Sequence, residues 1–371
     1  MGPHESLSRR AFARAAALGG ALPLPVLTER ALAQLSYPGE APPDAVLLNA
    51  NENPLGPCAE ALEAMSQALR KGGRYQFGET LRLARKAAEL EGVPEGCVQS
   101  FAGSSDPLHR VVLAFCGPGR AFVTADPGYE AGERAARFVQ APVHRVPLTK
   151  EYAHDVEAML RAAGGEAGVF YVCNPNNPTG TLTPRDAIES LVRRKPAGSV
   201  VLVDEAYIHF CGAPSCVDMV RDGKDVVVLR TFSKIYGMAG LRAGLAFARP
   251  DLLDRIRPYG TGFLPVTGMV GAIASLEAKG VVGERREYMR RVREDLMAWL
   301  RANGIGFVPS VSNKIMIRTP RPGREIAAAM AARKVIIGRS WPSWPDYVRV
   351  TLGTPEEMEK FKAAFLQVIS A

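Results

Sequence analysis

Residues 168–207 read GVFYVCNPNNPTGTLTPRDAIESLVRRKPAGSVVLVDEAY, and they give the first indication of how the chain folds. The apolar runs Gly168–Cys173 and Ser199–Val203 are typical of strands that are buried on both faces. Between them, Thr183-Pro184 has the features of an N-cap followed by the first residue of a helix, which we expect to reach about Arg194. A strand, a helix and a second strand at this spacing predict a parallel sheet that is covered on both faces.

The same alternation continues on both sides of this segment. Further strands are expected at Val98–Ala102, Ala121–Thr124 and Asp225–Leu229. Beyond about residue 250 the pattern changes, and we expect a long helical stretch, two strands and a final helix, at about Gly271–Asn303, Lys314–Arg318, Tyr347–Leu352 and from the cap at Thr354 to about Ile369. The sequence therefore predicts an α/β fold: a large domain with a mostly parallel, doubly covered sheet, and a smaller α+β domain.

Composition and charge are those of an ordinary globular protein. The chain has 371 residues, of which 47% are hydrophobic and 23% are charged, and this length favours two domains. The net charge is +8, but basic and acidic residues are interleaved, which favours a solvated surface or anionic ligands over nucleic acid. The five histidines have no metal-ligand spacing, so we expect no metal site.

Polar side chains follow several of the expected strands at the point where each strand ends. They are Asn174–Gly180, Asp204, Lys234 and the pair Ser104-Ser105 before a helix start. Because the carboxyl ends of parallel strands meet at one edge, an amide, a carboxylate, a lysine and a helix N-terminus converge there. Pyridoxal phosphate needs this set: a buried carboxylate for its ring nitrogen, donors for its phenolic oxygen, a helix N-terminus with hydroxyls and a cation for its phosphate, and a lysine for its aldehyde.

Five ordered motifs carry a resemblance to a known family. They are LNANENPLGP at 48–57, NNPTG at 176–180, DEAY at 204–207, TFSK at 231–234 with AGLRAG at 239–244, and VRVTLGT at 348–354. From about residue 44 to its C-terminus the chain resembles the fold-type I aminotransferases of class I/II, and is most similar to histidinol-phosphate aminotransferases. The resemblance implies the aspartate-aminotransferase fold, with an arm and part of the small domain at 34–66, a large cofactor-binding domain at 67–255 and a small C-terminal domain at 256–371.

The same resemblance implies roles around the ring of pyridoxal phosphate. Lys234 is expected to hold the cofactor as a Schiff base and to shuttle the proton between Cα and C4′. Asp204 is expected to pair with the ring nitrogen, Asn177 and Tyr207 to bond the phenolic oxygen, and Tyr129 to stack on the ring.

At the phosphate, the resemblance implies a second group of residues. The expected ligands are Thr231, Ser233, Arg242 and the helix-start pair Ser104 and Ser105. Where the family has a Gly-x-Asp-Glu run, this chain has Gly103-Ser104-Ser105-Asp106. Tyr75 matches the tyrosine that reaches the phosphate of a neighbouring subunit, which implies a homodimer with shared active sites.

For the substrate, the resemblance implies binding by Arg349, Asn51 and Arg339. Arg349 is expected to grip the α-carboxylate as a two-pronged fork. Arg339 is placed to meet an acidic or phosphorylated substrate, whereas the nearby Trp341 and Trp344 equally indicate an aromatic one. The expected activity is transfer of an amino group from an amino acid or related amine to a 2-oxo acid. A decarboxylase or oxidase on the same scaffold, and a non-catalytic cofactor-binding protein, are the alternatives.

The first residues have the order of an export signal. Arg9-Arg10 precedes a weakly apolar run, Ala15–Leu27, and Ala31-Leu32-Ala33 provides a cleavage site before Gln34. The run is too short to span a bilayer, and residues 1–33 closely resemble a twin-arginine signal, which predicts a periplasmic enzyme. An amphipathic helix of a cytoplasmic protein is the alternative. The six cysteines show no framework spacing, and their pairing is left open.

Overall fold

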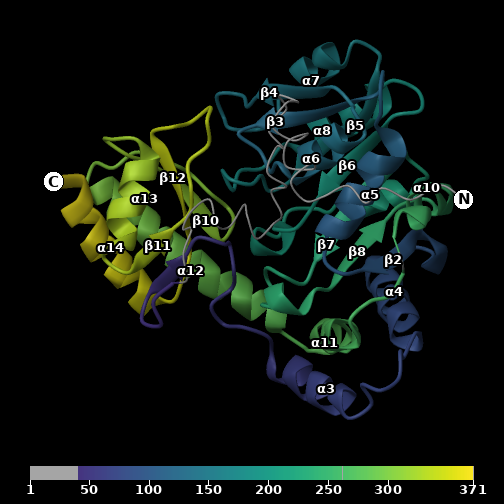
Figure 1. The fold of residues 1–371 in the computed structure, drawn as a ribbon, viewed down its shortest axis with the longest axis horizontal. Helices are drawn as coiled ribbons and strands as arrows, with labels where there is room; N and C mark the ends of the chain where they lie inside the picture. The colour runs from purple at the N-terminus through teal and green to yellow at the C-terminus, as the bar shows by residue number, and fades with distance from the viewer. Residues whose placement is uncertain (1–40, 261, 371) are drawn as a thin grey trace, which may run out of the picture.

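A computed structural model describes residues 41–260 and 262–370, and its centre is a seven-stranded sheet (Figure 1). In spatial order the strands are β2 (Val98–Phe101), β8 (Gly244–Phe247), β7 (Val226–Thr231), β6 (Val200–Asp204), β5 (Ala167–Cys173), β3 (Ala121–Asp126) and β4 (Val143–Pro147). All neighbouring pairs are parallel except the two that β8 forms. Every residue of β5, β6 and β7 is buried, as strands covered on both faces must be. The predicted fold class is confirmed.

Helices surround this sheet. Those before residue 260 are α3 (Ala59–Leu69), α4 (Gly78–Glu91), α5 (Ser105–Phe115), α6 (Ala131–Phe138), α7 (Val156–Ala163), α8 (Arg185–Arg194), α9 (Val217–Arg221) and α10 (Pro250–Ile256), with short 3-10 turns at Glu95–Cys97, Ile208–Phe210, Ala239–Leu241 and Arg257–Tyr259. Helix α8 begins at Arg185 rather than directly after the expected cap Thr183. The Thr183 hydroxyl is instead 2.7 Å from Nδ1 of the buried His154, and it accepts a hydrogen bond from the His154 backbone.

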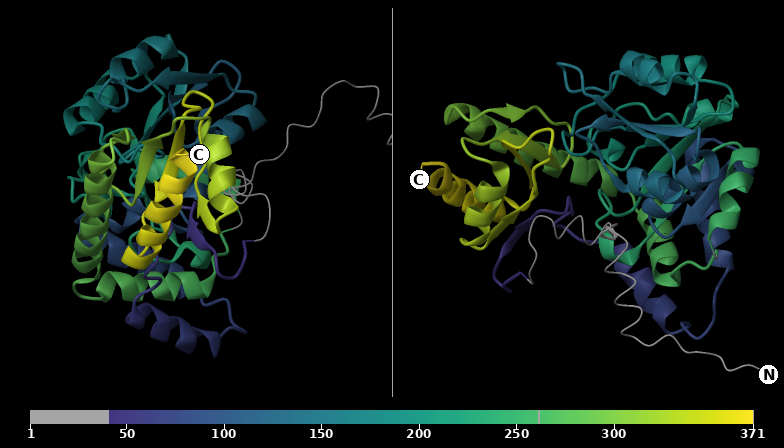
Figure 2. Two further views of the ribbon diagram at one scale, coloured as in Figure 1. Left: turned by 90° about the vertical axis from the view of Figure 1, so that its left-hand side faces the viewer. Right: turned by 45° about the horizontal axis from the view of Figure 1, so that its top comes forward.

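The seven-stranded sheet and its helices form a large layer, and a smaller layer lies beside it (Figure 2). It contains the parallel pair β1 (Val46–Leu48) and β11 (Val335–Ile337), and the antiparallel sheet β12 (Tyr347–Thr351), β10 (Lys314–Arg318) and β9 (Phe307–Val308). Helices α13 (Gly323–Ala331) and α14 (Pro355–Ser370) pack against these strands. Thr354 caps α14 as expected: its Oγ1 accepts from the Glu357 backbone, and Glu357 accepts in return from the Thr354 backbone.

The helical stretch expected at Gly271–Asn303 is present, but it is not one continuous helix. The structure has two helices, α11 (Val266–Glu277) and α12 (Val281–Ala302), which meet at a bend of 86°. Gly280, with φ of 81°, stands in the left-handed region that glycine enters without strain, and it ends the helical path. Helix α11 packs on α3 and α4, whereas α12 contacts both the turn at Ile208–Phe210 and α14, and so joins the two layers.

Two further features bear on the sequence predictions. In the part of the chain that the structure describes, no single helix is long and apolar enough to cross a membrane; only α11 and α12 taken together, across their bend, pass by length and composition. All six cysteines are unpaired thiols. The predicted export signal at 1–33 lies outside the described residues.

Candidate active site

The carboxyl ends of β5, β6 and β7 open into a cavity of about 220 Å³ between the two layers. Every residue that the sequence places in the site, except Tyr75, lines this cavity: Asn51, Ser104, Ser105, Tyr129, Asn177, Asp204, Tyr207, Thr231, Ser233, Lys234, Arg242, Arg339 and Arg349. They come from both layers and from the segment between Leu48 and α3. The structure therefore brings together residues that are far apart in the chain.

Asp204 is the last residue of β6 and is 4% exposed. Its Oδ2 accepts a hydrogen bond of 2.9 Å from the Tyr171 hydroxyl, and its Oδ1 accepts one of 3.1 Å from the Ala206 backbone. Burial, together with the nearby Asp204 carboxylate, raises the pKa of Tyr171 well above its usual value, so Tyr171 remains a donor. The Asp204 carboxylate is thus oriented from behind by a residue that looks in the sequence like one more apolar strand position.

Asn51 joins two of the predicted ring ligands. Its side-chain nitrogen lies 3.0 Å from the Tyr207 hydroxyl and 3.4 Å from Asn177 Oδ1. Its backbone nitrogen donates to Thr351 Oγ1 at 2.9 Å, which fixes this segment to the strand that carries Arg349. Burial raises the pKa of Tyr207, so its hydroxyl stays protonated and available as a donor.

Lys234 follows β7 and reaches back into the cavity. Its Nζ donates to the Ala50 carbonyl at 3.3 Å and lies 5.9 Å from the centre of the Tyr207 ring. The lysine expected to carry the cofactor therefore faces the residues expected to hold the cofactor ring.

A cradle for an anion lies at the N-terminus of α5. Ser233 Oγ lies 2.9 Å from Thr231 Oγ1 and accepts from Arg242 Nη1 at 3.2 Å. Arg242 Nη2 donates to the Ala102 carbonyl at 3.3 Å. Gly103, with φ of +87°, lies so close to Arg242 that a Cβ there would collide with Nη2 and force the guanidinium to move. A helix N-terminus, hydroxyls and a guanidinium suit a phosphate.

Arg349 lies at the opposite end of the cavity and is 8% exposed. Its Nη1 donates to Asn177 Oδ1 at 2.9 Å and its Nη2 to the Asn49 carbonyl at 2.6 Å, while its buried Nε has no hydrogen-bond partner among the described residues. Burial lowers the pKa of Arg349 to about 10, which still leaves a cation at neutral pH. A cationic guanidinium in the wall of the cavity suits an incoming carboxylate.

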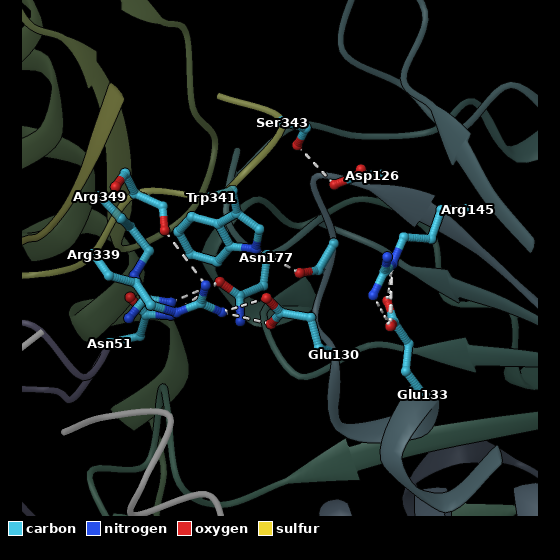
Figure 3. A network of polar contacts seen from close by, with 12 residues as sticks. Asn51, Asp126, Glu130, Glu133, Arg145, Asn177, Arg339, Trp341, Ser343 and Arg349 are labelled. Atoms are coloured by element: carbon cyan, nitrogen blue, oxygen red, sulfur yellow. Dashed lines mark hydrogen bonds and ion pairs between the residues drawn. The ribbon is translucent and has the colours of Figure 1, made fainter. Parts of the chain in front are cut away.

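Arg339 is not open to a ligand in the way that Arg349 is (Figure 3). Its Nη2 binds both carboxylate oxygens of Glu130, at 2.6 and 2.5 Å, and its guanidinium lies 3.9 Å above the Trp341 ring. Trp341 is 2% exposed, and Trp344 packs against Tyr152 and Tyr347. Neither tryptophan lines the cavity. Glu130 cannot be recognised as a site residue from the sequence, since nothing in its local pattern indicates its partner.

A second lysine, Lys314, lies beside the site and was also missed. It is wholly buried in β10, with its Nζ 3.1 Å from the centre of the Tyr207 ring and 3.0 Å from Ser312 Oγ. Burial lowers the pKa of Lys314 well below its usual value. In the sequence, a lysine that begins a short strand looks like a surface residue, and no signal distinguishes it.

Tyr75 lies outside the cavity of its own chain. It is 73% exposed, and its ring stacks on Phe77 at 5.2 Å and contacts Phe263 at 5.3 Å. Its predicted contact with a neighbouring subunit remains a prediction.

Comparisons with known proteins agree with this geometry. Residues 43–365 match the family model for aminotransferases of class I and II. The chain is 32% identical to the histidinol-phosphate aminotransferase of Moorella thermoacetica, over 88% of this chain and 86% of that protein. It is 35% identical to the aromatic amino acid aminotransferase of Nocardia farcinica, over 87% of this chain and 92% of that protein. The histidinol-phosphate aminotransferase of Sinorhizobium meliloti, solved in complex with pyridoxal-5′-phosphate, shares the fold with a TM-score of 0.84, at 24% identity and over 94% of this chain and 96% of that one.

Proposed function

The chain belongs to the class I and II aminotransferases and is a pyridoxal-phosphate-dependent transaminase; on that premise we propose how its own residues divide the work. The amino donor is an amino acid or a related amine, and the acceptor is a 2-oxo acid. The observation that carries this proposal is that Lys234, Asp204 and Arg349 face one cavity from two layers of the fold.

The described residues fit the cofactor. The space beside Arg242 is kept open by Gly103, where any Cβ would collide with the guanidinium. Asp204 supplies a buried carboxylate for the ring nitrogen, and Asn177 and Tyr207 supply hydrogen bonds for the phenolic oxygen. Tyr129 would cover the ring, and the phosphate would be held by Ser104, Ser105, Thr231, Ser233 and Arg242. When bound, pyridoxal phosphate supplies an electron sink for the charge that develops at the substrate Cα.

The remaining steps belong to the side chains. Arg349 binds the substrate carboxylate through its guanidinium, and Asn51, which bonds both Asn177 and Tyr207, fixes the positions of these two side chains at this end of the pocket. Lys234 would hold the cofactor through its Nζ, and the same Nζ would take up and pass on the proton that the substrate Cα gives up. Because Arg349 holds the carboxylate, the substrate binds in one orientation. The same Cα bond therefore faces Lys234 in each turnover.

The decisive experiment identifies both reaction and lysine. The purified protein is incubated with pools of amino acids and 2-oxo acids, and the products are identified by mass. Paired gain and loss of an amino group supports transamination, whereas loss of CO₂ or consumption of O₂ would indicate the decarboxylase or oxidase reaction. Borohydride should fix the cofactor on Lys234, and Lys234→Ala should abolish turnover while leaving the fold intact; a label on another lysine would contradict the assignment.

We also infer a homodimer with shared sites. Tyr75, Phe77 and Phe263 form an exposed aromatic cluster, with side chains 73%, 59% and 58% exposed. Clustered exposed apolar side chains of this kind mark interaction surfaces. A second copy of the chain is the occupant we propose, with its cofactor phosphate within reach of Tyr75.

Export through the twin-arginine route is part of the same proposal. It is supported by Arg9-Arg10, the weakly apolar run after them and the small residues before Gln34. A route that carries folded proteins suits an enzyme that must acquire its cofactor inside the cell.

A further inference from the structure

We propose that Glu130 sets the charge preference of the substrate side-chain pocket, so that donors with an uncharged side chain, aromatic ones included, are favoured over donors with a second carboxylate or a phosphate. This inference rests on the proposed function, since it concerns the substrate of the same site. Glu130 acts by occupying Arg339, the cation that would otherwise meet an acidic side chain.

In this pair, one guanidinium nitrogen is shared between the two oxygens of the carboxylate. One nitrogen of Arg339 binds both Glu130 oxygens, at 2.6 and 2.5 Å, and the side chains are only 12% and 24% exposed. The guanidinium rests 3.9 Å above Trp341, whose Nε1 donates to the Gly128 carbonyl at 2.9 Å. Arg339 is thus bonded to Glu130, and Trp341 beneath it is bonded to Gly128. Both contacts are made with the short segment that places Tyr129 in the cavity wall.

The charges at this end of the cavity then match one carboxylate. Arg349 and Arg339 contribute two positive charges, and Glu130 removes one of them. The groups are close enough to act on one another: burial is the main cause that lowers the pKa of Arg349, Arg339 lowers it further and Glu130 raises it. One positive charge therefore remains. The α-carboxylate that binds Arg349 neutralises it when the side chain of the donor is uncharged.

Among the described residues at this end of the cavity, a second anionic group finds no free cation. It must displace Glu130 from Arg339 and then remain beside the Glu130 carboxylate, where like charges repel in a partly buried setting. The other charged groups drawn in Figure 3 do not line the cavity: Glu133 is paired with Arg145, and Asp126 keeps its charge while accepting from Ser343 at 2.7 Å.

The test compares Glu130→Gln with the wild-type holoenzyme. We expect wild type to prefer phenylalanine to glutamate and to histidinol phosphate in kcat/KM. In Glu130→Gln, kcat/KM for the two anionic donors should rise relative to phenylalanine by about 10-fold or more, since Arg339 is freed. A binding measurement follows the absorbance of the bound cofactor during titration with two unreactive acids. The Kd of succinate should fall, and that of 3-phenylpropionate should stay unchanged.

The matched control is Glu133→Gln. It removes another two-oxygen ion pair, with Arg145 at 2.6–3.1 Å, from the helix that follows Glu130, but at a place that does not line the cavity. It should leave both ratios unchanged; if it fails to fold, Arg145→Gln, at a half-exposed position, replaces it. Adding Arg339→Gln to Glu130→Gln should cancel the gain for anionic donors.

A wild-type preference for the anionic donors, or unchanged ratios in a folded, cofactor-loaded Glu130→Gln, would overturn the assignment of Glu130. Failure of the proposed function looks different. In that case no donor yields an amino-transfer product with wild type, while the two dissociation constants still report whether Glu130 governs charge preference.

Discussion

Lys314 is a buried lysine whose ammonium lies against an aromatic ring rather than a carboxylate. Its pKa is lowered from a usual value of 10.5 because burial disfavours the charged form. The unfolded chain therefore binds a proton more strongly than the folded one, and stability rises with pH between the lowered folded pKa and 10.5. Below that window the lysine is a net cost to folding.

Lys314→Met should consequently stabilise the cofactor-free protein. We expect a gain of roughly 1–4 kcal/mol at neutral pH, comparable to that seen when buried ion pairs are replaced by apolar side chains of similar size. The gain should shrink as the pH approaches 10.5, where the unfolded lysine also loses its proton. Urea denaturation of both proteins at several pH values measures it. A stability loss that is equal at every pH would mean that the contacts of Lys314 with Tyr207 and Ser312 outweigh its desolvation.

The residues that follow strands were predictable, and those that depend on a distant partner were not. Asn177, Asp204 and Lys234 could be placed because each stands just beyond a strand-like run, in a motif with a chemical purpose. Glu130 and Lys314 could not, since the partner of the first is 209 positions away and the second contacts a ring on another strand's loop. The contacts that give Glu130 and Lys314 their roles exist only in the folded protein.

At the level of elements, the loop between β2 and α5 makes the phosphate cradle possible. Gly103→Ala would drive a Cβ into Arg242 Nη2 in a backbone with φ of +87°. We expect affinity for pyridoxal phosphate to fall by about 10-fold or more, because the guanidinium must move from the cradle. Equilibrium titration with the cofactor measures this.

Gly119→Ala is the control for backbone strain. Gly119 has φ of +77°, and no atom lies within 4 Å of the point that a Cβ would occupy, so alanine adds strain without a collision. It should lower the melting temperature as Gly103→Ala does, but leave cofactor affinity unchanged. Equal loss of affinity in the two variants would show that strain, and not the position of Arg242, governs binding.

Helices and strands were predicted well where the hydrophobic pattern was strong. They were predicted poorly where the backbone conformation of a single residue set the point at which an element ended. The buried strands β5, β6 and β7 have continuous apolar runs, so their existence followed from the sequence. The 86° bend between α11 and α12 did not, because the helical pattern runs through Gly280 and a single glycine costs a helix only about 1 kcal/mol. The short strands β4 and β8 lacked a distinctive pattern.

On the scale of the whole molecule, the exposed aromatic cluster should hold two copies together. Phe77→Asp would place a charge in the proposed interface, so we expect the protein to shift from dimer to monomer and to lose activity. Sedimentation velocity at micromolar concentration measures the shift. Phe138→Asp is the control, because Phe138 is 82% exposed on α6 and away from the cluster. A wild-type monomer at these concentrations would refute the shared site.

The export prediction concerns the same molecule in the cell. Changing Arg9 and Arg10 together to Lys should trap an uncleaved but active enzyme in the cytoplasm, because the twin-arginine route reads the arginine pair. Cell fractionation and N-terminal sequencing measure the outcome, and the native protein should begin at or near Gln34. Native enzyme that keeps residues 1–33 in the cytoplasm would contradict export and leave the catalytic proposal intact.

The hydrogen bond from Asn51 to Thr351 has a consequence for synthesis. The two residues are 300 positions apart, so the bond cannot form until the whole segment between them has been made. A nascent chain that already contains Lys234 and Asp204 still lacks Arg349 and the anchor for Asn51, so its pocket has no substrate end. Productive capture of substrate therefore begins only after Thr351 has been made, and a chain that stops before Arg349 lacks the guanidinium that binds the substrate carboxylate.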